Sequence, residues 1–166
     1  ASIFKVTGVM KYTVMLDSYT TKVAEYENEY KDASQARKVE LTVNRFFEAV
    51  NCKDYRAAYN YLNSTYRQEQ FGSQEAFENY VKNTWFNMNS FTYKSMSTDS
   101  NGTINVFGTI SDYDDEGSFN AIYIDKTFFV KLGNSYNDFE ISFGKECFRR
   151  KEDVIWKSTR EVMLKM

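Results

Sequence analysis

The stretch VELTVNRFFEAV, residues 39–50, repeats apolar residues at helical spacing and carries the strongest structural signal in the chain. Its apolar members recur three or four positions apart, so they lie on one face of an α-helix. They are Val39, Val43, Phe46, Phe47 and Val50. Ser34 precedes the repeat and is a suitable N-cap. A face this apolar must be buried, so another layer of structure has to cover it.

Shorter amphipathic segments flank this helix. Residues 19–31 carry a stripe of Tyr and Val, residues 55–62 a stripe of Tyr, Ala and Leu after Asp54, and residues 74–85 an aromatic stripe after a capping Ser73. The opening residues 3–16 are rich in β-branched and aromatic side chains and are interrupted by Gly8, which indicates a short strand or an extended arm. Up to Trp85 the chain is therefore predicted to be mainly helical.

Beyond Trp85 the apolar spacing changes to the alternation of β-strands. Asn101-Gly102 is a hairpin signal between the first two strands, and Gly108 lies mid-strand, where it predicts a bulge or bend. The four expected strands span residues 91–97, 103–111, 119–132 and 138–143. We therefore predict an α+β fold, in which N-terminal helices pack on a curved antiparallel sheet of about four strands.

Three regions are expected along the chain. Residues 1–33 form an N-terminal arm and helix packed on the domain, residues 34–143 form the domain itself, and residues 144–166 form a basic C-terminal tail whose apolar spacing is compatible with a helix. That tail has seven basic and four acidic residues. With 166 residues and a hydrophobic fraction of 42%, a single core should suffice.

Composition excludes several classes of function. The formal net charge is −2, which offers no attraction for a polyanion, so we expect no nucleic-acid binding. Histidine is absent, which removes histidine-based triads, dyads and metal sites. Cys52 and Cys147 are the only cysteines, too few for a thiolate zinc cage, and free buried thiols are favoured over one long-range disulfide.

No apolar run is long enough to span a membrane. The chain begins with Ala, which suggests either an excised piece of a longer polypeptide or a trimmed tag. An N-terminal anchoring helix that has been cut away is the preferred interpretation, and a signal peptide before Ala1 would have been removed in the same way. Contact with a membrane is thus expected only through a segment absent from this sequence.

Residues 39–143 resemble the nuclear transport factor 2-like superfamily, which has a cystatin-like fold. The resemblance lies in the helix with Phe46 and Phe47, the Asn51-Cys-Lys-Asp54 turn, the following Tyr- and Ala-rich helix, the Phe71-Gly-Ser73 break and the closing meander. In this superfamily the sheet curls into a cone. Some members use the cone to hold a steroid-sized substrate, as in ketosteroid isomerase-like and polyketide cyclase-like proteins. Others have filled cones and serve as binding or assembly modules, among them domains of conjugation and type IV secretion scaffolds.

The candidate pocket residues are Tyr93, Tyr123 and Asp125. Isomerase-like chemistry needs a carboxylate base and a hydrogen-bond donor in an apolar site, and Asp125 with a tyrosine could supply both. A solvated strand carboxylate is the stronger interpretation, so no residue is assigned as catalytic. The loop from Asp112 to Gly117 begins like a calcium loop, but Tyr123 replaces the required glutamate, and we interpret it as a solvated loop. We expect no metal and no cofactor.

The sequence thus predicts a non-catalytic binding or assembly domain that has a protein partner or self-associates. The Asn-, Lys- and Tyr-rich, Pro-free composition resembles that of a Gram-positive protein, so the expected place is the extracellular face of the membrane, anchored or secreted, with the cytoplasm as the alternative. Two other functions stay open: a small-molecule lyase or isomerase that uses the cone pocket, and a component of a conjugation or type IV secretion scaffold.

Overall fold

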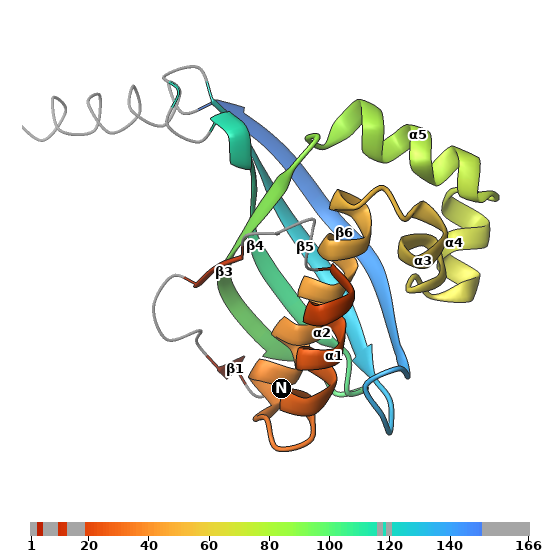
Figure 1. The fold of residues 1–166 in the computed structure, drawn as a ribbon, viewed down its shortest axis with the longest axis vertical. Coiled ribbons are helices and arrows are strands. Elements are labelled where there is room, and N and C mark those ends of the chain that lie inside the picture. The colour runs from red at the N-terminus through yellow and green to blue at the C-terminus, as the bar shows by residue number, and fades with distance from the viewer. Residues whose placement is uncertain (1–2, 5–9, 13–18, 116–117, 119–120, 151–166) are drawn as a thin grey trace, which may run out of the picture.

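A computed structural model describes residues 3–4, 10–12, 19–115, 118 and 121–150, with side chains described from Ala24 onward. Within these residues five α-helices precede the four long strands of an antiparallel sheet (Figure 1). The predicted α+β class is confirmed. The expected helix or tail at residues 151–166 lies outside the described residues.

The helices are α1 (Tyr19–Tyr30), α2 (Gln35–Asn51), α3 (Tyr55–Asn60), α4 (Ser64–Gln70) and α5 (Gln74–Thr84). The predicted caps Ser34 and Ser73 are confirmed, because each side chain accepts a hydrogen bond from a backbone N–H in the first turn of the next helix. Asp54, expected to favour the first turn through its charge, caps α3 in the same way. Helix α4 was not predicted. Asn63 caps it. Its sequence indicates only a break, because the helix has no fully buried side chain and hence no strong apolar stripe.

The strands are β1 (Ile3–Phe4), β2 (Met10–Tyr12), β3 (Asn89–Thr98), β4 (Ile104–Asp112), β5 (Ile122–Leu132) and β6 (Phe139–Arg150). The sheet order is β1-β3-β4-β5-β6, and β2 also pairs with β3. The short strands β1 and β2 thus extend the sheet at its β3 edge. Strand β6 runs seven residues past the expected end at position 143, so residues 144–150 belong to the sheet and not to a tail.

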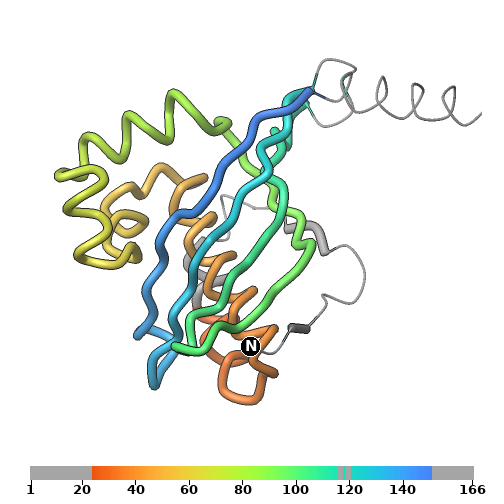
Figure 2. The backbone as a smooth tube through the Cα atoms, turned by 180° about the vertical axis from the view of Figure 1, so that it is seen from behind, coloured from red at the N-terminus to blue at the C-terminus, as the bar shows by residue number. Residues whose placement is uncertain are grey.

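One face of the curved sheet wraps around α2, while α3, α4 and α5 lie beside β6 (Figure 1). Seen from behind, no described helix covers the other face (Figure 2). We call the face toward α2 the inner face and the opposite one the outer face. The loop between α3 and α4 covers the open edge of β6. The backbone N–H of Asn63 donates to the Ile141 carbonyl, and the backbone N–H of Ile141 donates to the Tyr61 carbonyl.

The core is aromatic and lies between α2, α5 and the inner face. The apolar face predicted for residues 39–50 is buried throughout, and Leu62, Phe77, Val81 and Trp85 join it in the core. Tyr59 is partly buried at its edge. Phe47 stacks on Phe91 at a centroid distance of 5.2 Å, and Phe46 meets Phe128 edge-on at 6.2 Å. The interior of the curved sheet is therefore filled by the chain's own rings.

Gly108 allows this packing. A Cβ at this position would lie 2.4 Å from the Phe91 ring, so only glycine lets that ring cross β4. The predicted bulge lies on the neighbouring strand instead: pairing passes from Tyr93–Gly108 to Ser95–Phe107, which leaves Lys94 of β3 as the extra residue.

Candidate functional site

The three pocket residues predicted from the sequence do not come together. Tyr93 is buried on the inner face, where its hydroxyl donates to the Asn44 side chain. Tyr123 and Asp125 flank the buried Ile124 and so lie on the outer face. No shared pocket of Tyr93, Tyr123 and Asp125 exists.

Asp125 belongs to a small polar cluster on the outer face. Its carboxylate accepts hydrogen bonds from the Thr109 hydroxyl and from Arg149 Nε, both at 2.8 Å, and the Arg149 guanidinium lies over the Tyr123 ring. Partial burial acts to raise the pKa of Asp125, but the hydrogen bonds from Arg149 and Thr109 outweigh it and lower that pKa. This carboxylate is thus a partner in a surface ion pair.

A different carboxylate, Glu146, lies on the inner face. The Tyr80 hydroxyl lies 2.8 Å from each of its oxygens, and the Trp85 indole N–H donates to Oε1 at 2.9 Å. The Lys126 ammonium, whose side chain is 2% exposed, forms an ion pair with the same oxygen at 3.4 Å. Glu146 is therefore held by three groups: Tyr80 of α5, Trp85 directly after α5, and Lys126 of the neighbouring strand β5.

The Lys126 ammonium completes this cluster. It lies 4.4 Å from the centroid of the Phe143 ring and 3.5 Å from the Gly144 carbonyl oxygen. Burial lowers the pKa of Lys126, and the charge of Glu146 opposes this shift. Sequence parity could have found this lysine, because Ile124 and Phe128 flank it two positions away on the same face of β5.

Glu146 could not be found in that way. Pairing between β5 and β6 shifts register between Lys126 and Phe128, so that two residues of β6, Gly144 and Lys145, lie opposite Thr127. Phe143 and Glu146 consequently share the inner face although they are three positions apart.

Beside the Glu146 cluster lies a pocket of about 240 Å³, here called the interior pocket. Its walls come from α4, α5, β5 and β6, namely Tyr66, Gln70, Phe71, Tyr80, Lys126, Phe143, Gly144 and Glu146. Burial raises the pKa of the Tyr66 phenol to about 12, and burial followed by the Glu146 charge raises that of Tyr80 further. The pocket is therefore lined by two neutral phenols, by aromatic rings and by one ion pair, Lys126 with Glu146.

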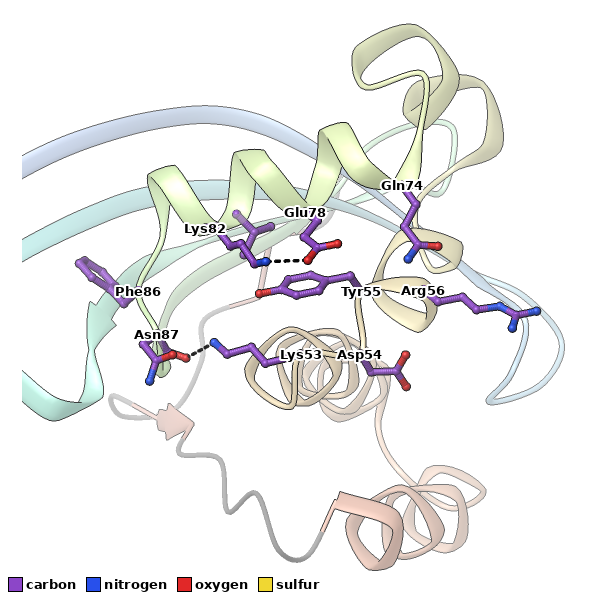
Figure 3. A pocket seen from close by; sticks show the side chains of 10 residues that line it. Lys53, Asp54, Tyr55, Arg56, Gln74, Glu78, Lys82, Phe86 and Asn87 are labelled. Atoms are coloured by element: carbon purple, nitrogen blue, oxygen red, sulfur yellow. Dashed lines mark hydrogen bonds and ion pairs between the residues drawn. The ribbon is translucent and has the colours of Figure 1, made fainter.

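A second hollow, the α3–α5 groove, lies on the outside of the helices and has a volume of about 590 Å³ (Figure 3). Its floor is the Tyr55 ring, with Lys82 and Glu78 of α5 on one side and Lys53 on the other. Lys82 pairs with Glu78 at 2.7 Å, and the Lys53 ammonium donates to the Asn87 carbonyl oxygen at 2.7 Å. The remaining lining residues are Asp54, Arg56, Gln74, Val81 and Phe86.

The two cysteines are unbridged, as predicted. Cys52 ends α2 and is partly buried, whereas Cys147 is exposed within β6, so the expectation of two buried thiols is wrong for Cys147. Its neighbour Phe148 is also exposed, because the far end of β6 extends beyond the helices (Figure 1).

In comparisons with known proteins, no family model, curated protein or solved structure matches this chain. Among the described residues no helix is long and apolar enough to cross a membrane. Function therefore has to be argued from the sites themselves.

Proposed function

We propose that this chain is a non-catalytic binding or assembly domain. The observation that carries the proposal is the state of Glu146, the carboxylate beside the interior pocket. The Tyr80 hydroxyl shares its one proton between both oxygens, and Oε1 also accepts from the Trp85 indole N–H and pairs with Lys126. Oε1 therefore has no lone pair left for a ligand, and proton transfer to Oε2 would weaken the hydrogen bond from Tyr80 that helps to hold this carboxylate.

The space next to Glu146 also favours binding over turnover. The rings of Phe46, Phe47, Phe91 and Phe128 fill the interior of the sheet, and the remaining pocket of about 240 Å³ is smaller than the roughly 300–1,000 Å³ typical of small-molecule sites. The larger hollow is the α3–α5 groove, whose charged side chains lie outside the core.

Exchange of α-protons of ketones with solvent tests the absence of acid–base catalysis. Cyclic ketones would be incubated with the domain in D₂O and followed by NMR, with wild type and Glu146→Gln compared at matched concentration. We expect wild type to give no exchange above the buffer rate. Exchange above buffer that Glu146→Gln abolishes would overturn the proposal.

The lyase or isomerase alternative is supported by one feature, Lys126. A buried amine with a lowered pKa beside a pocket is the type of group that forms Schiff bases with carbonyl compounds. Its test is borohydride trapping with small aldehydes, read by mass spectrometry. A stable adduct on Lys126 would favour this alternative, whereas labelling spread over exposed lysines would not.

The proposal also includes the fold family and the kind of partner. The helices-first order and the curved sheet around α2 support a nuclear transport factor 2-like fold with a filled cone, and such cones suit a partner-binding or scaffold role. A protein partner is proposed in place of nucleic acid because the net charge is −2.

The extracellular location can be tested through Cys147. This thiol is exposed in the structure, so a membrane-impermeant maleimide added to intact cells should label it if the domain lies outside. Cys147→Ser is the control for site specificity. Labelling that appears only after cell lysis would place the domain inside and contradict the proposed location.

A further inference from the structure

We propose that the α3–α5 groove binds a small organic anion, a carboxylate or a phosphate monoester, whose charged group lies between the Lys53 and Lys82 ammonium groups over Tyr55. This inference rests on the proposed function and names the class of ligand that the domain binds.

The placement of the cations supports this class of ligand. Lys53 comes from the turn after α2, Lys82 comes from α5, and both line the same hollow (Figure 3). The Lys53 ammonium donates to the Asn87 carbonyl and the Lys82 ammonium to the Glu78 carboxylate, and an ammonium has three N–H donors. Donors therefore remain on both groups for an anion between them.

The repulsion between the two lysines supports this placement. Burial lowers the pKa of Lys53, and the nearby positive charge of Lys82 lowers it further. An anion between them would relieve this repulsion.

The backbone at Lys53 has an unusual conformation for a lysine. Its φ of 62° lies in the left-handed region, where glycine is usual. The residue follows the C-cap of α2, and the backbone N–H groups of Lys53 and Asp54 donate to the carbonyls of Val50 and Ala49, which is the pattern of a Schellman motif. A lysine with this backbone is strained relative to glycine, and the Schellman motif holds Lys53 at a fixed place on the rim of the groove.

The chemistry of the groove walls supports the same class of ligand. The buried Tyr55 ring forms its floor, Lys82 lies 5.6 Å from the centroid of that ring, and Val81 and Phe86 line the same hollow. A ligand with an apolar body and one anionic group matches these walls. The lining carries three basic residues, Lys53, Arg56 and Lys82, against the acids Asp54 and Glu78.

The two acids are accounted for by local contacts. Asp54 caps α3 by accepting a hydrogen bond from the Ala57 N–H, and Glu78 pairs with Lys82. Glu78 competes with the ligand for Lys82, so its neutralisation should strengthen binding.

The test is calorimetric titration of the folded chain with hexyl phosphate, hexanoate and inorganic phosphate, with hexanol as the neutral control. We expect saturable binding of hexyl phosphate or hexanoate but not of hexanol, and the tighter of the two anions identifies the head group. Binding of inorganic phosphate at an affinity equal to hexyl phosphate would contradict the role of the apolar wall.

The variants separate binding from folding. Lys53→Gly removes the ammonium and relieves the strained backbone, so the melting temperature should hold or rise while affinity falls at least about fivefold. Lys82→Met should weaken binding to a similar extent, Glu78→Gln should tighten it, and Lys131→Met, at the distant end of β5, should leave it unchanged.

The proposal is overturned if none of the anions binds saturably, or if Lys53→Gly and Lys82→Met bind as tightly as wild type. Failure of the proposed non-catalytic function would appear instead as Glu146-dependent exchange of ketone protons, a separate measurement at a separate site.

Discussion

The interior pocket and the α3–α5 groove both combine aromatic rings with charged side chains, yet they use the charges differently. In the interior pocket Glu146 and Lys126 are paired with each other and enclosed by Tyr80, Trp85 and Phe143. In the groove Lys53 and Lys82 come from separate elements and repel each other. The interior charges thus stabilise the packing of α5 on the sheet, whereas the groove charges are arranged to meet a ligand.

Under the proposed function, the buried charged pair beside the interior pocket stabilises the fold and does not catalyse a reaction. Burial requires that each charge be matched inside the fold, and that match uses the hydrogen bonds that chemistry would need. In a binding site, by contrast, some N–H donors face the solvent and stay available for a ligand.

The largest effect is expected from the aromatic core next to the interior pocket. Phe47→Ala should lower the free energy of unfolding by about 3–5 kcal/mol, because it removes a fully buried ring that stacks on Phe91. Urea denaturation followed by circular dichroism measures this loss. Phe107→Ala, at an exposed ring on the outer face, is the control, and a loss at Phe47 below about 1 kcal/mol would show that this position is not core.

Breaking the interior ion pair should be the next largest effect. Glu146→Gln leaves the buried Lys126 ammonium without its counter-charge and should cost about 3 kcal/mol, the lower end of the range for buried pairs. The double variant Glu146→Gln with Lys126→Met should lose less than the sum of the single losses. Additive losses would contradict the pairing. In the groove, Glu78→Gln should leave the urea midpoint nearly unchanged.

Alkaline pH should act on the interior pocket through its phenols. Burial in the folded state raises the pKa of Tyr66 to about 12 from the ordinary 10.0 of the unfolded chain, so between these two pH values the unfolded chain releases a proton that the folded chain keeps. This contribution to stability is complete below pH 10 and is lost as pH rises toward 12. Tyr66→Phe should make the decline across this window shallower in urea titrations at stepped pH.

The matched control for Tyr66 is Phe71→Leu, which removes a ring from the same pocket but no titrating group. It should lower stability at every pH without changing the slope. Equal slopes for wild type and Tyr66→Phe would contradict the burial of this phenol.

The smallest effect is expected on the outer face. Asp125→Asn breaks the pair with Arg149 and should cost about 0.5–1 kcal/mol at pH 7, as for a partly exposed pair. Because the folded state lowers the Asp125 pKa, this contribution is present above the unfolded pKa of 3.8 and is lost as pH falls through the folded value. The variant and wild type should therefore converge in acid, and a difference that persists at low pH would point to packing instead.

Sequence reasoning reached the fold because periodicity is a local signal. The helical repeat of residues 39–50 and the alternation after Trp85 each report burial on one face, and the structure confirms both. Sequence reasoning did not find the correct site residues. The predicted pocket includes Asp125 and Tyr123, although the alternation of β5 turns both side chains outward. The same alternation indicates that Lys126 points inward.

The other site residues depend on contacts distant in sequence. Glu146 reaches the inner face only through the register shift opposite Thr127, and Lys53 meets Lys82 only because α3 packs on α5. Neither a bulge position nor a helix pairing is encoded in a short spacing pattern, so both required the three-dimensional structure.

An NMR titration with hexyl phosphate tests the central contrast most directly, since each region has its own reporter. The backbone amides of Lys53, Tyr55 and Asn87 report on the groove, and the Trp85 indole N–H, which donates to Glu146, reports on the interior pocket. We predict saturable shifts of the groove amides, with the indole resonance unmoved. Saturable movement of the indole while the groove amides stay in place would show that the interior pocket is the binding site and would contradict this account.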